Sequence, residues 1–93
     1  MKFILTFTWA PDIHTRDQAV ERFRNSGGQP PAGVALLGRW TKADLSGGIV
    51  LLEAEDLRKL TEFAFMWSDL MKLEIAPVID DDDLHSVFER VAK

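Results

Sequence analysis

The sequence contains no cysteine, which excludes disulfides, thiolate nucleophiles, iron–sulfur clusters and cysteine-based zinc sites. It also lacks an excess of positive charge: 11 Lys and Arg stand against 15 Asp and Glu, for a formal charge of −4. Nucleic acid and anionic membrane surfaces are therefore not expected partners. No apolar run approaches the roughly 20 residues that span a bilayer. The opening run MKFILTFTW is too short and too interrupted by threonine for a signal peptide, so we expect a cytoplasmic protein.

The chain does have enough apolar material for one compact core. Its 93 residues are 46% hydrophobic and 28% charged, which is ordinary for a globular protein and too apolar for intrinsic disorder. A chain of this length has room for one core and no second one. We therefore expect a single domain over residues 1–93.

Periodicity predicts the secondary structure. Alternating apolar residues predict a strand at about 2–9, and VALLGRW and GGIVLLEA, joined by TKADLS, predict a hairpin; KLEIAPVI alternates in the same way. Apolar spacings of three and four predict helices at about 15–26, at about 56–70 and within LHSVFERVA. Thr15 to Gln18 have the spacing of a capping box, and Asp56 is a candidate N-cap.

The predicted order, β-α-β-β-α-β plus a terminal helix, is the α+β ferredoxin-like arrangement with a four-stranded antiparallel sheet, strands one and three central and Pro77 on an edge strand. Alternation also sorts the strand residues by face. The face expected beneath the two helices carries Phe3, Leu5, Phe7, Trp9, Val34, Leu36, Trp40, Val50, Leu52, Leu73 and Ile75. The other face mixes Ile4, Ala35, Leu37, Ile49, Leu51 and Val78 with Thr6, Thr8, Arg39, Glu53, Lys72 and Glu74. The second face is too apolar for water and too polar for a dry core, which predicts a sheet-to-sheet homodimer through Ile4, Thr6, Leu37, Arg39, Leu51 and Glu53.

The segments GVALLGRW at 33–40 and AFMWSDLMKLEIAPVIDDDD at 64–83, with a hairpin that ends in a glutamate between them, also carry a family resemblance. Together they resemble an uncharacterised bacterial family of short domains of unknown function in the dimeric α+β barrel superfamily. The resemblance covers essentially the whole chain and implies the fold and a homodimer. The superfamily includes cofactor-independent monooxygenases, dehalogenases, haem-degrading enzymes and stress-response proteins, so the resemblance implies no one activity and no catalytic residues.

Four consecutive aspartates, Asp80 to Asp83, precede the terminal helix, with His85 nearby. Carboxylates with a histidine could hold a hard cation, but the glycine-containing spacing of a calcium loop is missing. Acidic residues just before an apolar-periodic helix stabilise its positive N-terminal end. We therefore expect the run to start the helix, and we expect no metal and no cofactor.

Five residues are candidates for a ligand pocket. Trp9, Trp40 and Trp67 could wall an aromatic site or could simply be core residues. His14 could be a general base or a surface histidine, and Asp69 at a helix end needs a salt bridge, a turn hydrogen bond or a functional role.

Arg39 and Glu53 could bind an anionic substrate or neutralise each other, and pairing is favoured because an isolated buried charge is costly. No Ser-His-Asp order, HExxH or paired-carboxylate motif is present.

Two hypotheses follow. The chain is a small homodimeric module that at most binds an apolar or aromatic small molecule. Alternatively, it is a cofactor-independent monooxygenase-like enzyme with Trp9, His14, Trp40 and Trp67 around an aromatic substrate.

Overall fold

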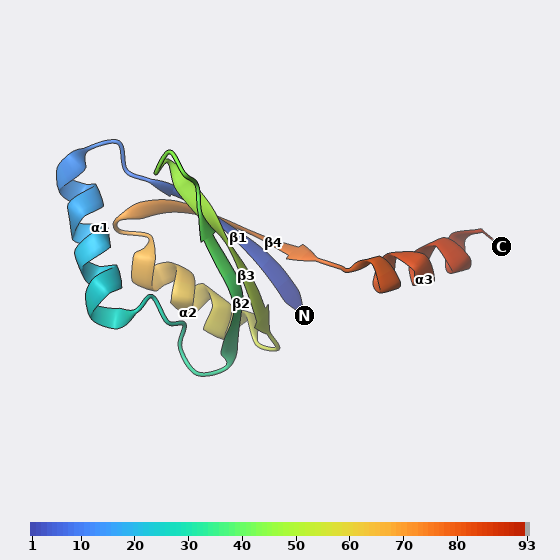
Figure 1. Ribbon diagram of the computed structural model, residues 1–93. Helices are drawn as coiled ribbons and strands as arrows, with labels where there is room; N and C mark the ends of the chain where they lie inside the picture. The colour runs from blue at the N-terminus through green and yellow to red at the C-terminus, as the bar shows by residue number, and fades with distance from the viewer. Residues whose placement is uncertain (93) are drawn as a thin grey trace.

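A computed structural model describes residues 1–92 and shows four strands and three helices in that range (Figure 1). In chain order they are β1 (Lys2–Trp9), α1 (Ile13–Ser26), β2 (Val34–Thr41), β3 (Gly47–Ala54), α2 (Leu57–Trp67), β4 (Met71–Val78) and α3 (Asp81–Val91). The strands form one antiparallel sheet in the order β2-β3-β1-β4. The predicted ferredoxin-like α+β fold is confirmed, including the central positions of β1 and β3 and Pro77 on the edge strand β4.

Both α1 and α2 lie on the same side of the sheet (Figure 1). The face they cover, here the inner face, supplies Phe3, Leu5 and Phe7 from β1 and Val34, Val50, Leu52 and Ala54 from the hairpin, all buried. Helix α2 adds three buried residues, Leu60, Phe63 and Trp67, but α1 adds only Ala19. Helix α1 is therefore the looser of the two covers.

An extra residue in β2 changes which side chains face the helices. Leu36 pairs with Leu52 and Gly38 pairs with Leu51, so two β2 steps oppose one β3 step and the ladder contains a bulge at Leu37. Because side chains alternate along a strand, one additional residue moves everything beyond it to the opposite face. Arg39 consequently pairs with Val50 in a row of the inner face, while Trp40 pairs with Ile49.

The predicted faces were therefore wrong for Arg39 and Trp40, which lie beyond the bulge. Trp40 was expected in the core but is 60% exposed on the other face, and Arg39 was expected on that face but lies on the inner one. Gly38 allows this placement, since a Cβ there would meet the Trp40 indole at 2.5 Å. The uncovered side of the sheet, here the open face, is made by cross-strand rows of Trp40, Ile49, Thr6 and Glu74, then Gly38, Leu51, Ile4 and Ala76, then Ala35, Glu53, Lys2 and Val78.

Aspartates begin all three helices. Asp12 accepts a hydrogen bond from the Thr15 backbone N–H at 2.9 Å, so α1 begins at Ile13 and the predicted capping box at Thr15 was wrong. The prediction for α2 is confirmed, because Asp56 accepts from Arg58 N–H at 2.9 Å. In the acidic run, Asp80 accepts from Asp83 N–H at 2.9 Å, and Asp81 to Asp83 occupy the first turn of α3. The aspartates do start the last helix, as predicted, and Asp80 is the capping residue.

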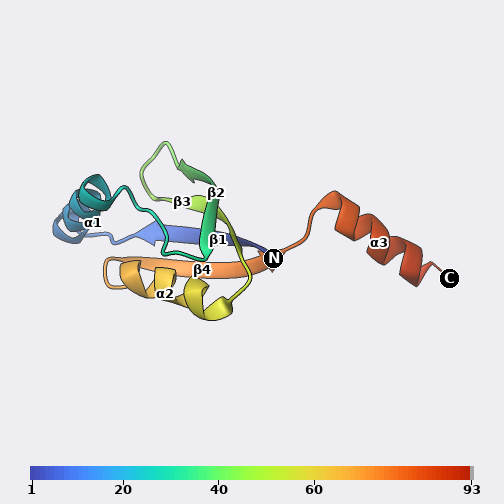
Figure 2. The same ribbon diagram turned by 90° about the horizontal axis from the view of Figure 1, so that it is seen from below.

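Helix α3 stands away from the rest of the molecule (Figures 1 and 2). None of its residues is buried, and Leu84, Val87, Phe88 and Val91 form an exposed apolar stripe. The radius of gyration, 15.6 Å, exceeds the value of about 12 Å typical of a compact chain this long. No helix within residues 1–92 combines the length and apolarity needed to cross a membrane.

Candidate functional site

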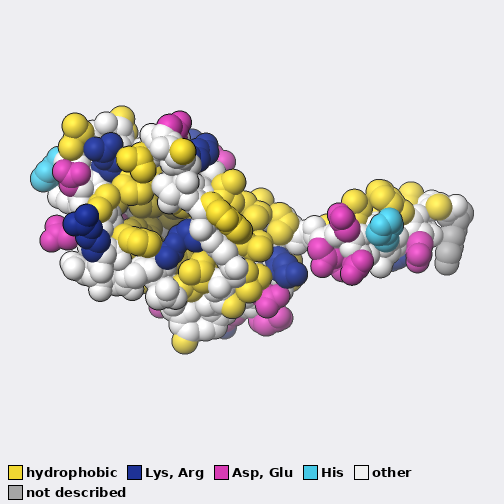
Figure 3. Space-filling view, viewed as in Figure 1, with side chains coloured by type: hydrophobic (Ala, Val, Ile, Leu, Met, Phe, Trp, Pro, Cys, Tyr) yellow, Lys and Arg dark blue, Asp and Glu magenta, His cyan; other side chains and the backbone are white. Residues whose placement is uncertain are grey.

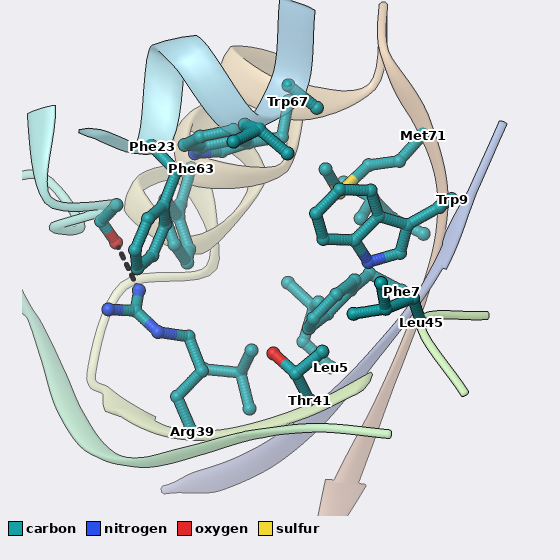
Figure 4. A pocket seen from close by; sticks show the side chains of 15 residues that line it. Leu5, Phe7, Trp9, Phe23, Arg39, Thr41, Leu45, Phe63, Trp67 and Met71 are labelled. Carbon is teal, nitrogen blue, oxygen red and sulfur yellow. Dashed lines mark hydrogen bonds between the residues drawn. The ribbon is translucent and has the colours of Figure 1, made fainter. Parts of the chain in front are cut away.

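A cavity of about 290 Å³ lies between the inner face of the sheet and the helices α1 and α2 (Figure 4). Its existence follows from the loose cover by α1, which buries one small residue, Ala19, against the sheet. The lining comes from every strand and from both covering helices: Leu5, Phe7, Trp9, Ala19, Val20, Phe23, Gly28, Arg39, Thr41, Leu45, Val50, Phe63, Trp67, Met71 and Leu73. The volume lies at the lower end of the range of small-molecule sites, about 300–1,000 Å³.

Aromatic side chains make up much of the wall. Phe7 and Trp9 of β1 lie with ring centroids 6.4 Å apart and planes tilted by 46°. Phe63 and Trp67 project from α2 and Phe23 from α1, and Figure 4 shows these rings around the same space. Such walls can stack on a flat apolar ligand and offer a large contact area.

Arg39 is the one charged side chain in the lining described above. Its guanidinium donates to the carbonyls of Gly28 at 2.8 Å and Gly27 at 3.1 Å, and it lies 4.6 Å from the centre of the Phe23 ring. Gly27 is the C-cap of α1, so Arg39 holds the end of that helix where the dipole is negative. Burial lowers the pKa of Arg39 from its ordinary value, although an arginine remains charged at neutral pH.

Two further polar groups belong to residues of the lining. The Trp9 indole N–H is buried and has no hydrogen-bond partner anywhere in residues 1–92. Thr41, which Figure 4 shows on the sheet side of the cavity, contributes a hydroxyl. A buried donor without a partner costs free energy, so the Trp9 N–H is an unsatisfied group in the cavity wall.

The β2–β3 turn places Leu45 at the cavity. Leu45 has φ of 62°, in the left-handed region that favours glycine and asparagine. Hydrogen bonds from the Ser46 backbone and hydroxyl to the Asp44 carboxylate, at 3.0 and 2.7 Å, stabilise the turn. This strained backbone conformation places an apolar side chain, 53% exposed, in the cavity lining.

Of the five predicted pocket residues, Trp9 and Trp67 line the cavity, and Trp40, His14 and Asp69 do not. His14 is exposed on α1, where its Nε2 lies 3.1 Å from the Gln18 amide nitrogen. Asp69 forms a two-pronged salt bridge with Arg22, with both oxygens at 2.8 Å, so the salt-bridge alternative for Asp69 is confirmed. The Arg22 guanidinium holds the pKa of Asp69 below its ordinary value.

The predicted pairing of Arg39 with Glu53 is wrong. Glu53 pairs with Ala35 and with Lys2 on the open face, whereas Arg39 lies on the inner face and bonds to backbone carbonyls. Of the predicted interface residues, Ile4, Thr6, Leu51 and Glu53 lie on the open face, and Leu37 is the bulge residue, 47% exposed. Arg39 is the one that moves from the predicted interface to the cavity.

Sequence reasoning missed Arg39, Thr41 and Leu45 as cavity residues. The signal for the first two was the dipeptide LG at 37–38, since glycine inside a strand often marks a bulge. Within residues 1–92 no group of three His, Cys, Asp or Glu side chains is arranged to hold a metal ion.

The comparison with protein families matches residues 1–92 to a domain of unknown function, DUF3303. The chain belongs to the DUF3303 family. A search of curated proteins finds no match. The family assignment agrees with a short domain of unknown function and brings no activity with it.

Proposed function

We propose that this DUF3303 protein binds a small apolar or aromatic molecule in the cavity between its sheet and helices α1 and α2. The observation that carries the proposal is the buried Trp9 N–H, which has no partner within the described chain and lies in an aromatic wall. An apolar cavity with a few convergent polar groups is the usual form of a small-molecule site. Here those groups are the Trp9 N–H, the Thr41 hydroxyl and the Arg39 guanidinium.

Binding is favoured over catalysis by what surrounds the cavity. Its lining residues include no carboxylate and no imidazole, and His14 is on the outer surface of α1. A monooxygenase-like reaction that relied on His14 as proton acceptor would need that side chain within hydrogen-bond reach of the substrate. The cavity as it stands supplies stacking, one cation and two neutral polar groups, which suit recognition.

A ligand screen tests the proposal. We expect some members of a panel of aromatic and aliphatic small molecules to raise Tm and to quench tryptophan fluorescence, because two of the three tryptophans line the cavity. Val20→Phe, which places a ring in the cavity, should abolish the response. Ile13→Phe, also on α1 but 65% exposed and outside the cavity lining, is the matched control and should leave it unchanged. A panel response that survives Val20→Phe would place binding elsewhere.

We further propose that the protein is a homodimer of the dimeric α+β barrel kind, formed through the open face. Trp40, Ile49, Leu51 and Ile4 occupy adjacent rows on this face, and Trp40 and Ile49 are 60% and 40% exposed. The same face carries Lys2 and Lys72 alongside Glu53 and Glu74, so a two-fold arrangement can set opposite charges against each other. A mixed apolar and charged surface of this kind suits contact with a second copy.

Helix α3 supports the same proposal independently. An isolated helix of 11 residues is only marginally stable in water, and α3 buries none of its side chains against its own protomer. Figure 3 shows an exposed hydrophobic row along this helix. The row belongs to the stripe of Leu84, Val87, Phe88 and Val91, which would be buried by contact with another apolar surface. Helix α3 extends away from the sheet after the end of β4, where a second copy of the chain could supply that apolar surface. We therefore propose that α3 packs on the partner protomer.

A further inference from the structure

The charge of Arg39 points to the chemical class of the ligand. No carboxylate within residues 1–92 comes within salt-bridge distance of Arg39, although ion pairs occur at other residues such as Arg22 and Arg58. Its two hydrogen-bond acceptors are neutral carbonyls, which occupy two of the five guanidinium N–H groups and leave the net charge in place. A partly buried cation with donors to spare is a site for an anion.

The position of Arg39 is fixed rather than adjustable. The guanidinium lies over the Phe23 ring and is tied to Gly27 and Gly28, and a Cβ at Gly28 would come within 2.6 Å of its Nη1. Both Nη atoms donate to these carbonyls, and the N–H groups that remain on Nε, Nη1 and Nη2 can donate to a carboxylate. The group is therefore preorganised at one side of the cavity before any ligand arrives.

The two neutral polar groups lie toward the other end. Along the sheet, Arg39 shares its row with Leu5, while Thr41 shares the next inner row with Phe7, and Trp9 lies one inner row further. Inner rows are about 7 Å apart, so the Trp9 N–H does not serve the same ligand atom as Arg39. Between them the lining is aromatic and aliphatic.

We propose that the ligand is an elongated apolar acid, with its carboxylate at Arg39, an aromatic or aliphatic middle against the rings, and a neutral hydrogen-bond acceptor such as a carbonyl oxygen at the Trp9 N–H. The inference rests on the proposed function, since it assigns chemistry to the same cavity. It adds which end of the ligand is charged and how the ligand is oriented in the cavity.

Three matched probes test it by calorimetry: 4-(4-acetylphenyl)butyrate, its primary amide, and 4-(4-isopropylphenyl)butyrate. The amide has nearly the same shape as the acid but replaces one charged carboxylate oxygen by a neutral NH2 group, and the isopropyl compound replaces the carbonyl acceptor by an apolar group of similar shape. In the unaltered protein the acetyl acid should bind at least about tenfold more tightly than its amide and several-fold more tightly than the isopropyl acid.

Variants assign each preference to a residue. Arg39→Gln should remove the preference for acid over amide, read as the ratio of the two affinities, while Arg24→Gln, at an exposed arginine of α1, should keep that ratio. Trp9→Phe should remove the preference for acetyl over isopropyl and keep the preference for acid. If Arg39→Gln fails to fold, Arg39→Lys keeps the charge without the planar guanidinium and should retain a reduced preference for acid.

The outcomes separate the two proposals. Equal binding of acid and amide by the unaltered protein would leave the cavity proposal standing and overturn the assignment of a carboxylate. A preference for acid that persists in Arg39→Gln, or that is undiminished in Arg39→Lys, would overturn it as well, by placing the anion elsewhere. Failure of all three probes to bind at millimolar concentration would count against the cavity as a ligand site and hence against both proposals.

Discussion

Arg22 of α1 donates to both carboxylate oxygens of Asp69, each at 2.8 Å, and to the Met66 carbonyl at 2.7 Å. The same guanidinium lies 5.5 Å from the Trp67 ring centre. The Arg22 side chain thus connects α1, which packs loosely over the cavity, to the C-terminal end of α2, which packs closely. Because α1 buries only Ala19, this connection is a main restraint on the position of α1.

Asp69→Asn should therefore lower the free energy of unfolding by about 0.5–1 kcal/mol at neutral pH, the upper range for a solvent-accessible pair with two-pronged geometry. Its half-exposed carboxylate limits the effect, since solvent screens the pair. Chemical denaturation measures it, with Glu62→Gln as control, because Glu62 faces Lys59 at 3.6 Å on the surface of α2. An equal loss in both variants would mean that the Arg22–Asp69 pair has no special role.

The same pair predicts a pH dependence. The pKa of Asp69 is depressed in the folded protein, chiefly by hydrogen bonds from Arg22, so the pair stabilises the fold above the ordinary pKa of an aspartate, about 3.9. That stabilisation is lost as pH falls below about 4 and through the folded pKa. The unfolding difference between the unaltered protein and Asp69→Asn should hence shrink in this acidic range. A difference that grows on acidification would contradict the assignment.

Capping by Asp80 predicts a contrast within the acidic run. Asp80→Ala should reduce helix content in α3, because the Asp83 N–H loses its acceptor, whereas Asp83→Ala should have a smaller effect. Amide chemical shifts of residues 81–91 report the change. Millimolar Ca²⁺ or Mg²⁺ should leave the Tm of the unaltered protein unchanged, and a cation-dependent rise that Asp80→Ala abolishes would instead support a metal site.

The homodimer proposal predicts that one charge on either surface weakens association. Trp40→Glu on the open face and Phe88→Glu on α3 should each shift light scattering toward the monomer at micromolar concentration. Phe65→Glu is the control: its side chain is 81% exposed on α2, away from both surfaces, and it should stay dimeric. A monomer in the unaltered protein would refute the proposal outright.

Fluorescence distinguishes the tryptophans that line the cavity from the one that does not. Ligand quenching should persist in Trp40→Phe and fall markedly in Trp67→Phe, since Trp67 lines the cavity and Trp40 lies across the sheet. Titrations on purified single variants measure this. Loss of quenching in Trp40→Phe alone would move the site to the open face.

The fold followed from the sequence because its signals are local. Alternation in β1 and helical spacing in α2 depend on neighbouring residues, and Asp56 caps α2 through a contact two residues away. The boundaries that differed did so for equally local reasons: Asp12 captures the Thr15 N–H before the predicted capping box can form.

The site was predicted only in part because it depends on register and on long-range contacts. Trp9 was placed correctly by alternation along an unbroken strand, but the faces of Arg39 and Trp40 depend on a bulge that alternation does not reveal. The cavity itself results from how far α1 sits from the sheet, which Ala19, Phe23 and the Arg22–Asp69 pair determine together. No spacing within the sequence encodes that distance.

The bulge at Leu37 also affects how relatives of this chain should be aligned. A relative with one residue fewer at this point would keep the same run of side chains after it but exchange their faces, so its arginine would join the surface and its tryptophan the cavity. Aligning β2 without a gap there would equate a residue that lines the cavity with one on the open face. Loss of one residue at this position of the edge strand would put Trp40 in the cavity in place of Arg39. The character of the cavity would thus change without the substitution of any side chain.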